Sequence, residues 1–271
     1  SIFHWFWGHV LPGLLLTPMA VGAAYFVIPR ITKTPLYSHT LSILGFWTLV
    51  VFYSHIGGHH ILQAPMPNWL KMISVVDSMF MFLPVIIVIV NLWMTWRGKG
   101  GKIFGDPAGK WIALGLFWYL ITGAQGSLQS LPGLQIITHF NNWTVGHAHI
   151  AVLGFSGFIT IGALWHILPL ITRKKLYSVK LVNIQFGLVM IGLSGFFIVL
   201  TIAGLIQGEA WYNGEVIYRV LPQLNAYMVL RAALGLFIIT GSFIGLYNII
   251  MTIRKGIPLE SFEQNKEGGA L

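Results

Sequence analysis

The stretch WTVGHAHIAVLGFSGFITIGALWHILPLI, residues 143–171, sets the fold class. A helix needs about 20 apolar residues, each rising about 1.5 Å, to cross about 30 Å of hydrocarbon. This stretch is long enough and contains no Asp, Glu, Lys or Arg. We therefore expect it to span a membrane, and the two histidines near its start, His147 and His149, need a reason to lie there.

The composition of the whole chain agrees with a membrane protein. Only 8% of the residues are charged and 56% are hydrophobic, with a mean hydropathy of +0.76, whereas soluble domains have about 25% charged residues. The chain has no cysteine, which excludes disulfides, thiolate metal sites and iron–sulfur clusters. Any metal must therefore be held by nitrogen or oxygen.

Apolar runs of spanning length recur, and they predict an all-α polytopic membrane bundle of seven transmembrane helices. No soluble domain and no internal repeat is expected, so residues 1–271 are interpreted as one transmembrane domain. The first residues, SIFHWFWGHV, lack a starting Met and the features of a signal peptide, and we expect upstream helices to be absent from this sequence. The expected spans are 5–28, 38–58, 70–96, 110–131, 143–171, 182–207 and 221–253.

The basic residues predict the topology. Alternate connections and the tail hold 13 of the 16 Lys and Arg residues, and by the positive-inside rule these segments face the cytoplasm. The first helix then runs inward and the C-terminus is cytoplasmic. The net charge of +9 is thus explained by topology, and we expect no nucleic-acid partner. The 13 residues are Arg30, Lys33, Arg97, Lys99, Lys102, Lys110, Arg173, Lys174, Lys175, Lys180, Arg254, Lys255 and Lys266.

Five histidines converge on the outer half of the predicted bundle: His9, His59, His60, His147 and His149. An ionisable side chain there costs about 2.5 kcal/mol or more unless it has a partner. A lone histidine is more often a core residue bonded to a carbonyl, but five at one depth, with an HH pair and an HxH pair, favour ligands.

Helix geometry separates these ligands into groups. Residues i and i+2 on an α-helix are about 200° apart, so His147 and His149 must serve two different cofactors, and haem with an axial imidazole fits between apolar helices. His59 and His60 diverge by about 100° and can bind one ion together with His9. Three imidazoles without thiolate or carboxylate suit copper or zinc.

With these motifs the chain resembles the haem–copper oxidase superfamily, and within it the cbb3-type cytochrome c oxidase catalytic subunit. The motifs are WFWGHV, GGHH followed by PMPNW, HFNNWTVGHAH and YMVLRAALG. The resemblance implies that His9, His59 and His60 bind copper, that His147 binds a high-spin haem and that His149 binds a low-spin haem. Oxygen would be reduced to water between the high-spin haem and the copper.

The resemblance also implies cofactors, partners and a location. We expect two haems, of b type, and one copper ion, with electrons arriving from c-type cytochrome subunits and an electron donor. Oxygen reduction would be coupled to proton uptake or pumping. The chain would lie in the inner (plasma) membrane of a bacterium or archaeon.

Further candidate residues follow. Tyr119 lies 20 residues before His139, where the family pattern places a redox-active tyrosine cross-linked to a copper-ligand histidine. Asp77 is the only acid within a predicted span and is a candidate for proton handling, or for a structural hydrogen bond. Arg231 is expected to pair with a haem propionate or to extend toward the surface. His139 and Asn142 are weaker candidates at the haem face.

The chain also departs from the family pattern. It matches only the last seven of about twelve helices, so the second axial histidine of the low-spin haem must come from another chain or segment. Gln125 stands where a glutamate is expected, and Asn142 where an aspartate is expected. Both changes weaken any proton route or propionate network carried over from the family.

Three alternative functions remain open at this point. Nitric oxide reductase, a sister enzyme, has non-haem iron and a glutamate in place of copper, but here the position four after His9 is Gly13. Asp77 keeps this alternative open. A non-enzymatic haem electron carrier would need only His147 and His149, and a channel or transporter gives no reason for the histidine pairs.

Overall fold

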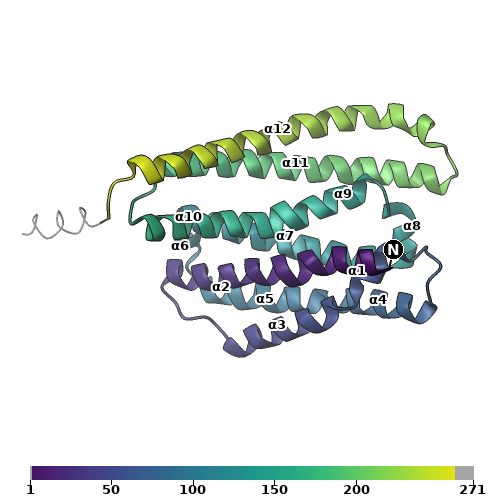
Figure 1. Cartoon of the computed structure of the whole chain (residues 1–271), viewed down its shortest axis with the longest axis horizontal. Helices are drawn as coiled ribbons and strands as arrows, with labels where there is room; N and C mark the ends of the chain where they lie inside the picture. The colour runs from purple at the N-terminus through teal and green to yellow at the C-terminus, as the bar shows by residue number, and fades with distance from the viewer. Residues whose placement is uncertain (1, 260–271) are drawn as a thin grey trace, which may run out of the picture.

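The computed structural model describes residues 2–259, and its long helices lie side by side in one elongated bundle (Figure 1). The described chain has no strand, only an isolated bridge between Lys174 and Pro258. The elements in order are α1 (Ile2–Val10), the π-helix η1 (Leu11–Leu16), α2 (Thr17–Thr32), α3 (His39–Tyr53), the 3₁₀-helix η2 (Ile56–Ile61), α4 (Asn68–Phe80), α5 (Phe82–Trp96), α6 (Gly100–Gly105), α7 (Pro107–Gln129), α8 (Pro132–Thr138), α9 (Asn142–His149), the π-helix η3 (Ile150–Gly157), α10 (Phe158–Thr172), α11 (Val179–Tyr212) and α12 (Ile217–Lys255).

Six helical segments of the described chain are long and apolar enough to cross a membrane: Phe3–Thr32, His39–Ile61, Asn68–Trp96, Asn142–Thr172, Val179–Tyr212 and Ile217–Lys255. They match six of the seven expected spans and confirm the all-α membrane fold. The remaining expected span, 110–131, corresponds to α7, which is a helix of 23 residues but is not among the six. Its last turns, GAQGSLQ, are small and polar, so the seven-span count is not confirmed in full.

The connections rich in basic residues gather at one end of the bundle. The turns α2–α3 and α10–α11, the short helix α6 and the end of α12 all lie there (Figure 1, left). We call this the basic end, and the opposite end, with α1, η2 and α8, the histidine end. Lys266, counted with the basic tail, lies outside the described residues.

Two helices widen into π-turns close after a histidine, which the sequence pattern did not predict. η1 begins two residues after His9, and η3 begins at the residue after His149. Pro12 lies in η1, and its carbonyl accepts from the backbone and the hydroxyl of Thr17. Such π-turns occur frequently at functional sites.

The structure contradicts the expectation that the chain has no internal repeat. Asn91 Oδ1 accepts from Ser38 N (2.9 Å) and its Nδ2 donates to Ser38 O (2.8 Å). Asn248 makes the same two bonds to Ser178, at 3.1 and 2.9 Å. Thr95 Oγ1 accepts from Tyr37 N (3.0 Å).

Thr252 makes the bond that corresponds to that of Thr95: its Oγ1 accepts from Tyr177 N (3.1 Å). We call each set, Ser38 with Asn91 and Thr95, and Ser178 with Asn248 and Thr252, an asparagine clamp.

The repeat extends from the clamps through the helices. Lys33 and Arg173, which end α2 and α10, both adopt left-handed backbone conformations, with φ of 55° and 51°. At the same offset His9 corresponds to His149, and η1 overlaps η3. We call residues 2–96 the first three-helix unit and residues 142–255 the second; α6 to α8 connect them.

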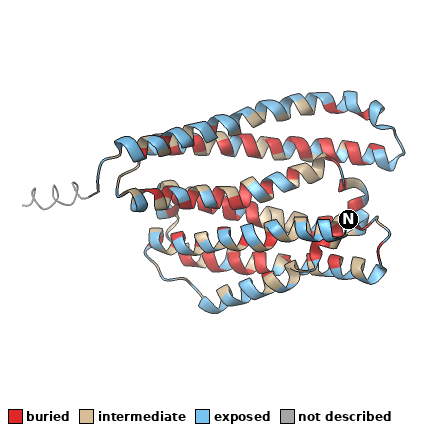
Figure 2. Cartoon of the chain, viewed as in Figure 1, coloured by how far each residue is buried: buried red, intermediate tan, exposed pale blue. Residues whose placement is uncertain are grey.

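The two units are covered to different extents (Figure 2). The main apolar core joins α2, α5, α7, α10 and one face of α11. α12 is mostly exposed, and only 11% of its spanning window is buried. α11 lies close to α8 at Gly208, where an added Cβ would be only 1.8 Å from the Ile137 carbonyl oxygen. The bundle thus leaves one long helix open on its outer side.

Candidate metal and haem site

Three imidazoles meet at the histidine end. His9 comes from the end of α1, and His59 and His60 from η2. Their ring centroids are 4.4–4.6 Å apart, and one nitrogen of each ring lies within 4.8 Å of the others. The 3₁₀ turn separates neighbours by about 120°, close to the expected divergence, and both histidines still reach His9. We call these residues the histidine triad.

The ring nitrogens of the triad are already assigned by their contacts. His9 Nδ1 faces His60 Nε2 directly, whereas His59 Nδ1 lies 2.7 Å from Ser78 Oγ, which leaves Nε2 of His59 for a ligand role. His9 Nδ1 and His60 Nε2 thus face each other within a group of three imidazoles whose nitrogens are close enough to bind one ion. The triad therefore fits one borderline metal ion such as copper.

Neighbouring aromatic rings and backbone bonds hold the triad in place. Trp5 stacks on His60 at a centroid distance of 4.6 Å, and Tyr53 lies 5.1 Å from the His9 ring. Gln135, from α8, donates to the His59 carbonyl. Gly13 makes room for Tyr53, since a Cβ there would lie 1.6 Å from the tyrosine ring. A larger side chain at residue 13, including a carboxylate, would displace this ring.

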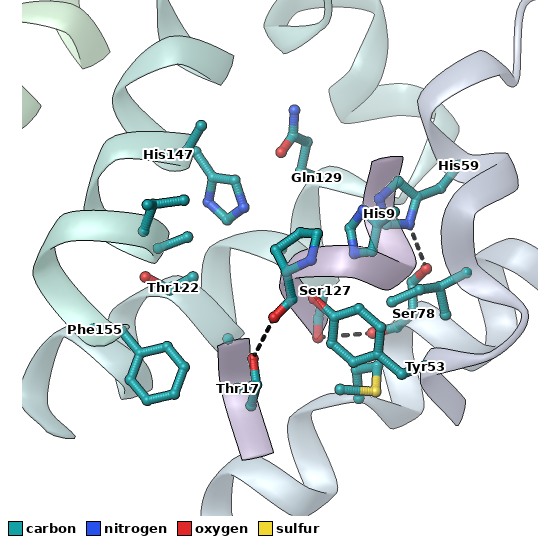
Figure 3. Close-up of a pocket in the computed structure, with 18 of the residues that line it drawn as sticks. His9, Thr17, Tyr53, His59, Ser78, Thr122, Ser127, Gln129, His147 and Phe155 are labelled. Carbon is teal, nitrogen blue, oxygen red and sulfur yellow. Dashed lines mark hydrogen bonds between the residues drawn. The ribbon is translucent and has the colours of Figure 1, made fainter. Parts of the chain in front are cut away.

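An apolar cavity of about 350 Å³ lies beside the triad. Figure 3 shows His9 and His59 reaching toward it from one side and His147 from the other. Gly123 and Gly126 line it without side chains, and a Cβ at Gly126 would lie 3.5 Å from His147 Cε1. The cavity thus offers a flat face beside an imidazole, as a haem bound through His147 requires.

Tyr119 also lines this cavity. It is buried on α7, stacked on Phe155 at 4.1 Å, and its hydroxyl has no hydrogen-bond partner among the described residues. Thr122, one turn further along α7, also has an unpartnered hydroxyl in the cavity wall. Buried hydroxyls without a hydrogen-bond partner are rare in native proteins, and they indicate a place for a ligand or a water molecule.

His147 and His149 face different surroundings. His147 Nδ1 lies 3.3 Å from Gln125 Oε1, and Trp143 is nearly parallel to its ring. His149 is exposed and does not line the cavity. Its Nδ1 donates to the Val145 carbonyl (2.7 Å), which leaves Nε2 as the nitrogen with a free lone pair.

Arg231 lies close to His149, on the neighbouring helix α12. Both lie near the same ring: the Phe196 ring centroid is 4.6 Å from that of His149 and 5.7 Å from the Arg231 guanidinium carbon. Neither His149 nor Arg231 lines the cavity beside the triad. This face of the chain therefore presents an exposed imidazole and a cation beside one phenyl ring.

The weaker candidates lie away from the cavity. His139 stacks on Phe140 at 3.8 Å beside the His60 backbone, and burial lowers its pKa, with that backbone acting in the opposite direction. Asn142 donates to Gln207 Oε1 from its side chain (2.8 Å) and its backbone (3.2 Å). It lines a second hollow of about 460 Å³ between α9, α11 and α12.

Asp77 does not face the triad. Its carboxylate lies 3.3 Å from His55 Nδ1, and it does not line the cavity. Within the part of the chain that the structure describes, no carboxylate joins the three imidazoles. Asp77, although it is next to Ser78 in the sequence, thus pairs with His55 and not with the triad.

Sequence reasoning missed Ser78, Thr122 and the contact between Gln125 and His147. Thr122 is signalled by spacing, because a residue three after Tyr119 lies on the same helix face. Ser78 and Gln125 carry no such signal, since each acts on a histidine far away in the sequence.

A buried imidazole triad beside an apolar cavity in a membrane bundle defines a class of membrane metalloprotein, and comparison identifies the family. The family model described as "Cytochrome C and Quinol oxidase polypeptide I" matches residues 1–237. The chain belongs to this family, that of haem–copper oxidase subunit I.

Individual proteins agree. The chain is 33% identical to "Cytochrome c oxidase subunit 1 homolog" of Agrobacterium tumefaciens, over 93% of this chain and 48% of that protein. It is 28% identical to "Cbb3-type cytochrome c oxidase subunit CcoN1" of Stutzerimonas stutzeri, over 96% of this chain and 56% of that protein. The chain thus spans about half the length of the curated relatives it matches.

A solved structure shares the fold. A cryo-EM structure of a "heme-copper terminal oxidase dimer" superposes with a TM-score of 0.80, at 20% identity, over 92% of this chain and 48% of that one. The family implies haems and copper as cofactors and a role in respiratory electron transport in a membrane.

Proposed function

We propose that this chain forms the oxygen-reducing part of a terminal oxidase of the cbb3 type. The observation that carries the proposal is the convergence of the histidine triad, His147 and Tyr119 on one cavity. The triad would hold copper, His147 would hold a high-spin haem, and oxygen would be reduced to water between them. The relatives name cytochrome c oxidase subunits, one of them cbb3-type.

The bound haem iron and copper would supply the electrons and the binding site for oxygen. The chain's own residues prepare that site. Ser78 and Gln135 fix His59, Gln125 contacts the outer nitrogen of His147, and the apolar wall of the cavity excludes bulk water. Phe155 keeps Tyr119 in one orientation by stacking on it.

Tyr119 would act as a proton and electron source within the cavity. Its hydroxyl hydrogen is not committed to any described acceptor, so the Oη proton is available to a reduced oxygen atom next to it. The cross-link to a copper-ligand histidine, implied by family resemblance, is part of the same proposal.

The second site would hold the low-spin haem. His149 would provide one axial ligand through Nε2, and Arg231 would pair with a propionate of this haem. Asn142 and His139 remain candidates for the surroundings of the propionates. The other axial ligand would come from a further chain or segment, which is consistent with the exposed position of His149.

The proposal extends to partners and orientation. Electrons would come from c-type cytochrome subunits, and the haems would be of b type. The basic end would face the cytoplasm, so that oxygen chemistry takes place toward the outer side of a bacterial or archaeal plasma membrane. Residues 1–271 would act as one domain of a larger catalytic core, with oxygen reduction coupled to proton uptake or pumping.

Nitric oxide reductase is the nearest alternative, and two observations oppose it. An iron site of that type needs a carboxylate beside the histidines, yet none joins the triad among the described residues. Gly13 packs against Tyr53, and Asp77 pairs with His55 instead.

The test is metal analysis combined with turnover of the purified complex that contains this chain. We expect two haems and one copper per complex, oxygen consumption with a reduced cytochrome c donor, and a carbon monoxide difference spectrum. Non-haem iron without copper would contradict the oxidase. Two haems that bind no carbon monoxide would indicate an electron carrier.

A further inference from the structure

Ser78, which lines the cavity, contacts the ring of a triad histidine without being one of the ligands, and its effect on that ring can be derived from its hydrogen bonds. It is only 2% exposed, on α4, and its hydroxyl oxygen lies 2.7 Å from His59 Nδ1. A buried hydroxyl at this distance from an imidazole nitrogen fixes which ring nitrogen carries the proton.

The direction of this hydrogen bond follows from the other contact of Ser78. Its Oγ donates to the Ser74 carbonyl one turn earlier, and this uses its single hydrogen. Toward His59 the hydroxyl can therefore only accept, so the proton of the neutral ring lies on Nδ1. The lone pair is then on Nε2, the nitrogen available to a metal held with His9 and His60.

Ser78 is itself held from a second helix. Ser127, on α7, donates to the Ser78 carbonyl at 2.8 Å, while Gln135 of α8 holds the His59 backbone. His59 is thus held at its ring by α4 and at its main chain by α8, and α7 in turn holds Ser78. Among the described hydrogen bonds, no comparable acceptor reaches the outer ring nitrogen of His9 or His60.

The repeat provides an internal comparison. Ser78 lies thirteen residues before Asn91 of the clamp, and the residue thirteen before Asn248 is Gly235. The position that corresponds to His59 is Val199. The second unit therefore folds without this hydroxyl, where there is no imidazole to orient.

We propose that Ser78 is a positioning residue for the metal site: its hydroxyl oxygen accepts a hydrogen bond from the Nδ1–H of His59 and thereby presents Nε2 to the ion. The inference rests on the proposed function for the identity of the metal, copper. Groups that hold a metal-bound histidine in this way typically contribute about 10- to 100-fold to metal affinity.

The experiment compares Ser78→Ala with Ser78→Thr in the complete purified complex. We expect Ser78→Ala to lose copper at a chelator concentration about 10- to 100-fold lower than the wild type, and Ser78→Thr, which keeps the hydroxyl, to restore retention. The infrared C–O stretch of carbon monoxide on the reduced copper should shift in Ser78→Ala only. Haem content reports assembly independently of copper.

Ser130→Ala is the matched control. Ser130 is a fully buried serine whose hydroxyl donates to the Ser127 carbonyl, so its variant removes a similar hydroxyl without touching a histidine. Copper retention should stay at the wild-type value. If Ser78→Thr fails to assemble, the comparison of Ser78→Ala with Ser130→Ala still decides.

The outcomes separate this inference from the proposed function. If Ser78→Ala retains copper as tightly as the wild type with an unchanged C–O stretch, the positioning role is wrong while the oxidase stands. If the wild type holds iron instead of copper, the oxidase is wrong, and retention of that iron in Ser78→Ala still tests the positioning role.

Discussion

The first three-helix unit ends in three imidazoles that face one another, whereas the second ends in an imidazole that faces outward. His9 and His149 occupy corresponding positions, each just before a π-turn. His9 is covered by η2, which brings His59 and His60 to it. The corresponding part of the second unit is the continuous helix α11, which offers Phe196 to His149. One helical frame thus ends either in a closed group of three imidazoles or in a single exposed imidazole, depending on whether its second helix breaks.

The two units are more alike at their basic ends than at their histidine ends. Comparing them shows which residues the asparagine clamp requires and which only one unit has. Both clamps use an asparagine and a threonine. In the first unit Asn91 also donates to Tyr25 Oη (3.3 Å) and Ser42 Oγ (3.0 Å). The corresponding residues of the second unit are Trp165 and Val182. The clamp therefore does not require these two hydroxyls.

The largest expected effect is the loss of one cofactor at a time, when the histidine at the end of one unit is replaced. We expect His59→Ala to lose copper and oxygen reduction while keeping both haems, with a fall in copper affinity beyond the roughly 10- to 100-fold typical of supporting residues. His149→Ala should lose one haem and keep copper. Metal and haem quantification of the two purified complexes checks this. Loss of the same cofactor from both variants would contradict the separation of the two sites.

Tyr119→Phe has the next largest expected effect, and it tests chemistry on α7, between the units. Because the hydroxyl bonds to nothing described, its removal leaves no partner unpaired, and stability should not fall. Turnover should fall by about 10²–10⁴-fold if the hydroxyl supplies a proton. Steady-state oxygen consumption and thermal unfolding are the two measurements. Full activity would remove Tyr119 from the mechanism.

The clamps provide a smaller, structural test. Asn91→Ala and Asn248→Ala each leave serine backbone groups unpaired, which costs about 1–3 kcal/mol per buried group. Asn91→Ala should cost more, because it also strips Tyr25 and Ser42 of their shared partner. Thermal unfolding of the complex in detergent ranks them. A greater loss for Asn248→Ala would contradict this ranking.

The smallest expected effect concerns Asp77, whose counterpart in the second unit is Leu234. The His55 side chain of the pair is 57% exposed, and exposed ion pairs contribute about 0–1 kcal/mol. Asp77→Asn should therefore change stability by less than about 1 kcal/mol. A proton-handling role would instead change turnover and its pH profile. Unchanged turnover at every pH would leave the pair a purely structural contact.

The sequence was sufficient for those features that depend on local pattern. Spanning length and low charge predict the helices, and the HH and HxH spacings predict which histidines can share an ion. α7 fits less well, because its last turns line a cavity and so replace apolar residues with glycine, serine and glutamine. Where part of a membrane helix lines a polar site, its hydropathy no longer identifies it as a membrane span.

Features that depend on contacts across the sequence could not be predicted. The π-turns η1 and η3, which contain Pro12 and Ser156, are not revealed by helical periodicity. Ser78 acts on His59 from another helix. The repeat escaped notice because apolar residues are interchangeable on lipid-facing helices, so only short polar stretches stayed alike.

The short stretches that form the two clamps share a sequence pattern. Both clamps have similar sequences: LYS occurs at residues 36–38 and 176–178, and NLWMT at 91–95 corresponds to NIIMT at 248–252. Since the clamp needs only the serine, the asparagine and the threonine, the pair LYS and N-x-x-M-T forms a fingerprint of the duplicated unit. It gives a way to count copies of this unit in longer proteins, where overall similarity between copies has been lost.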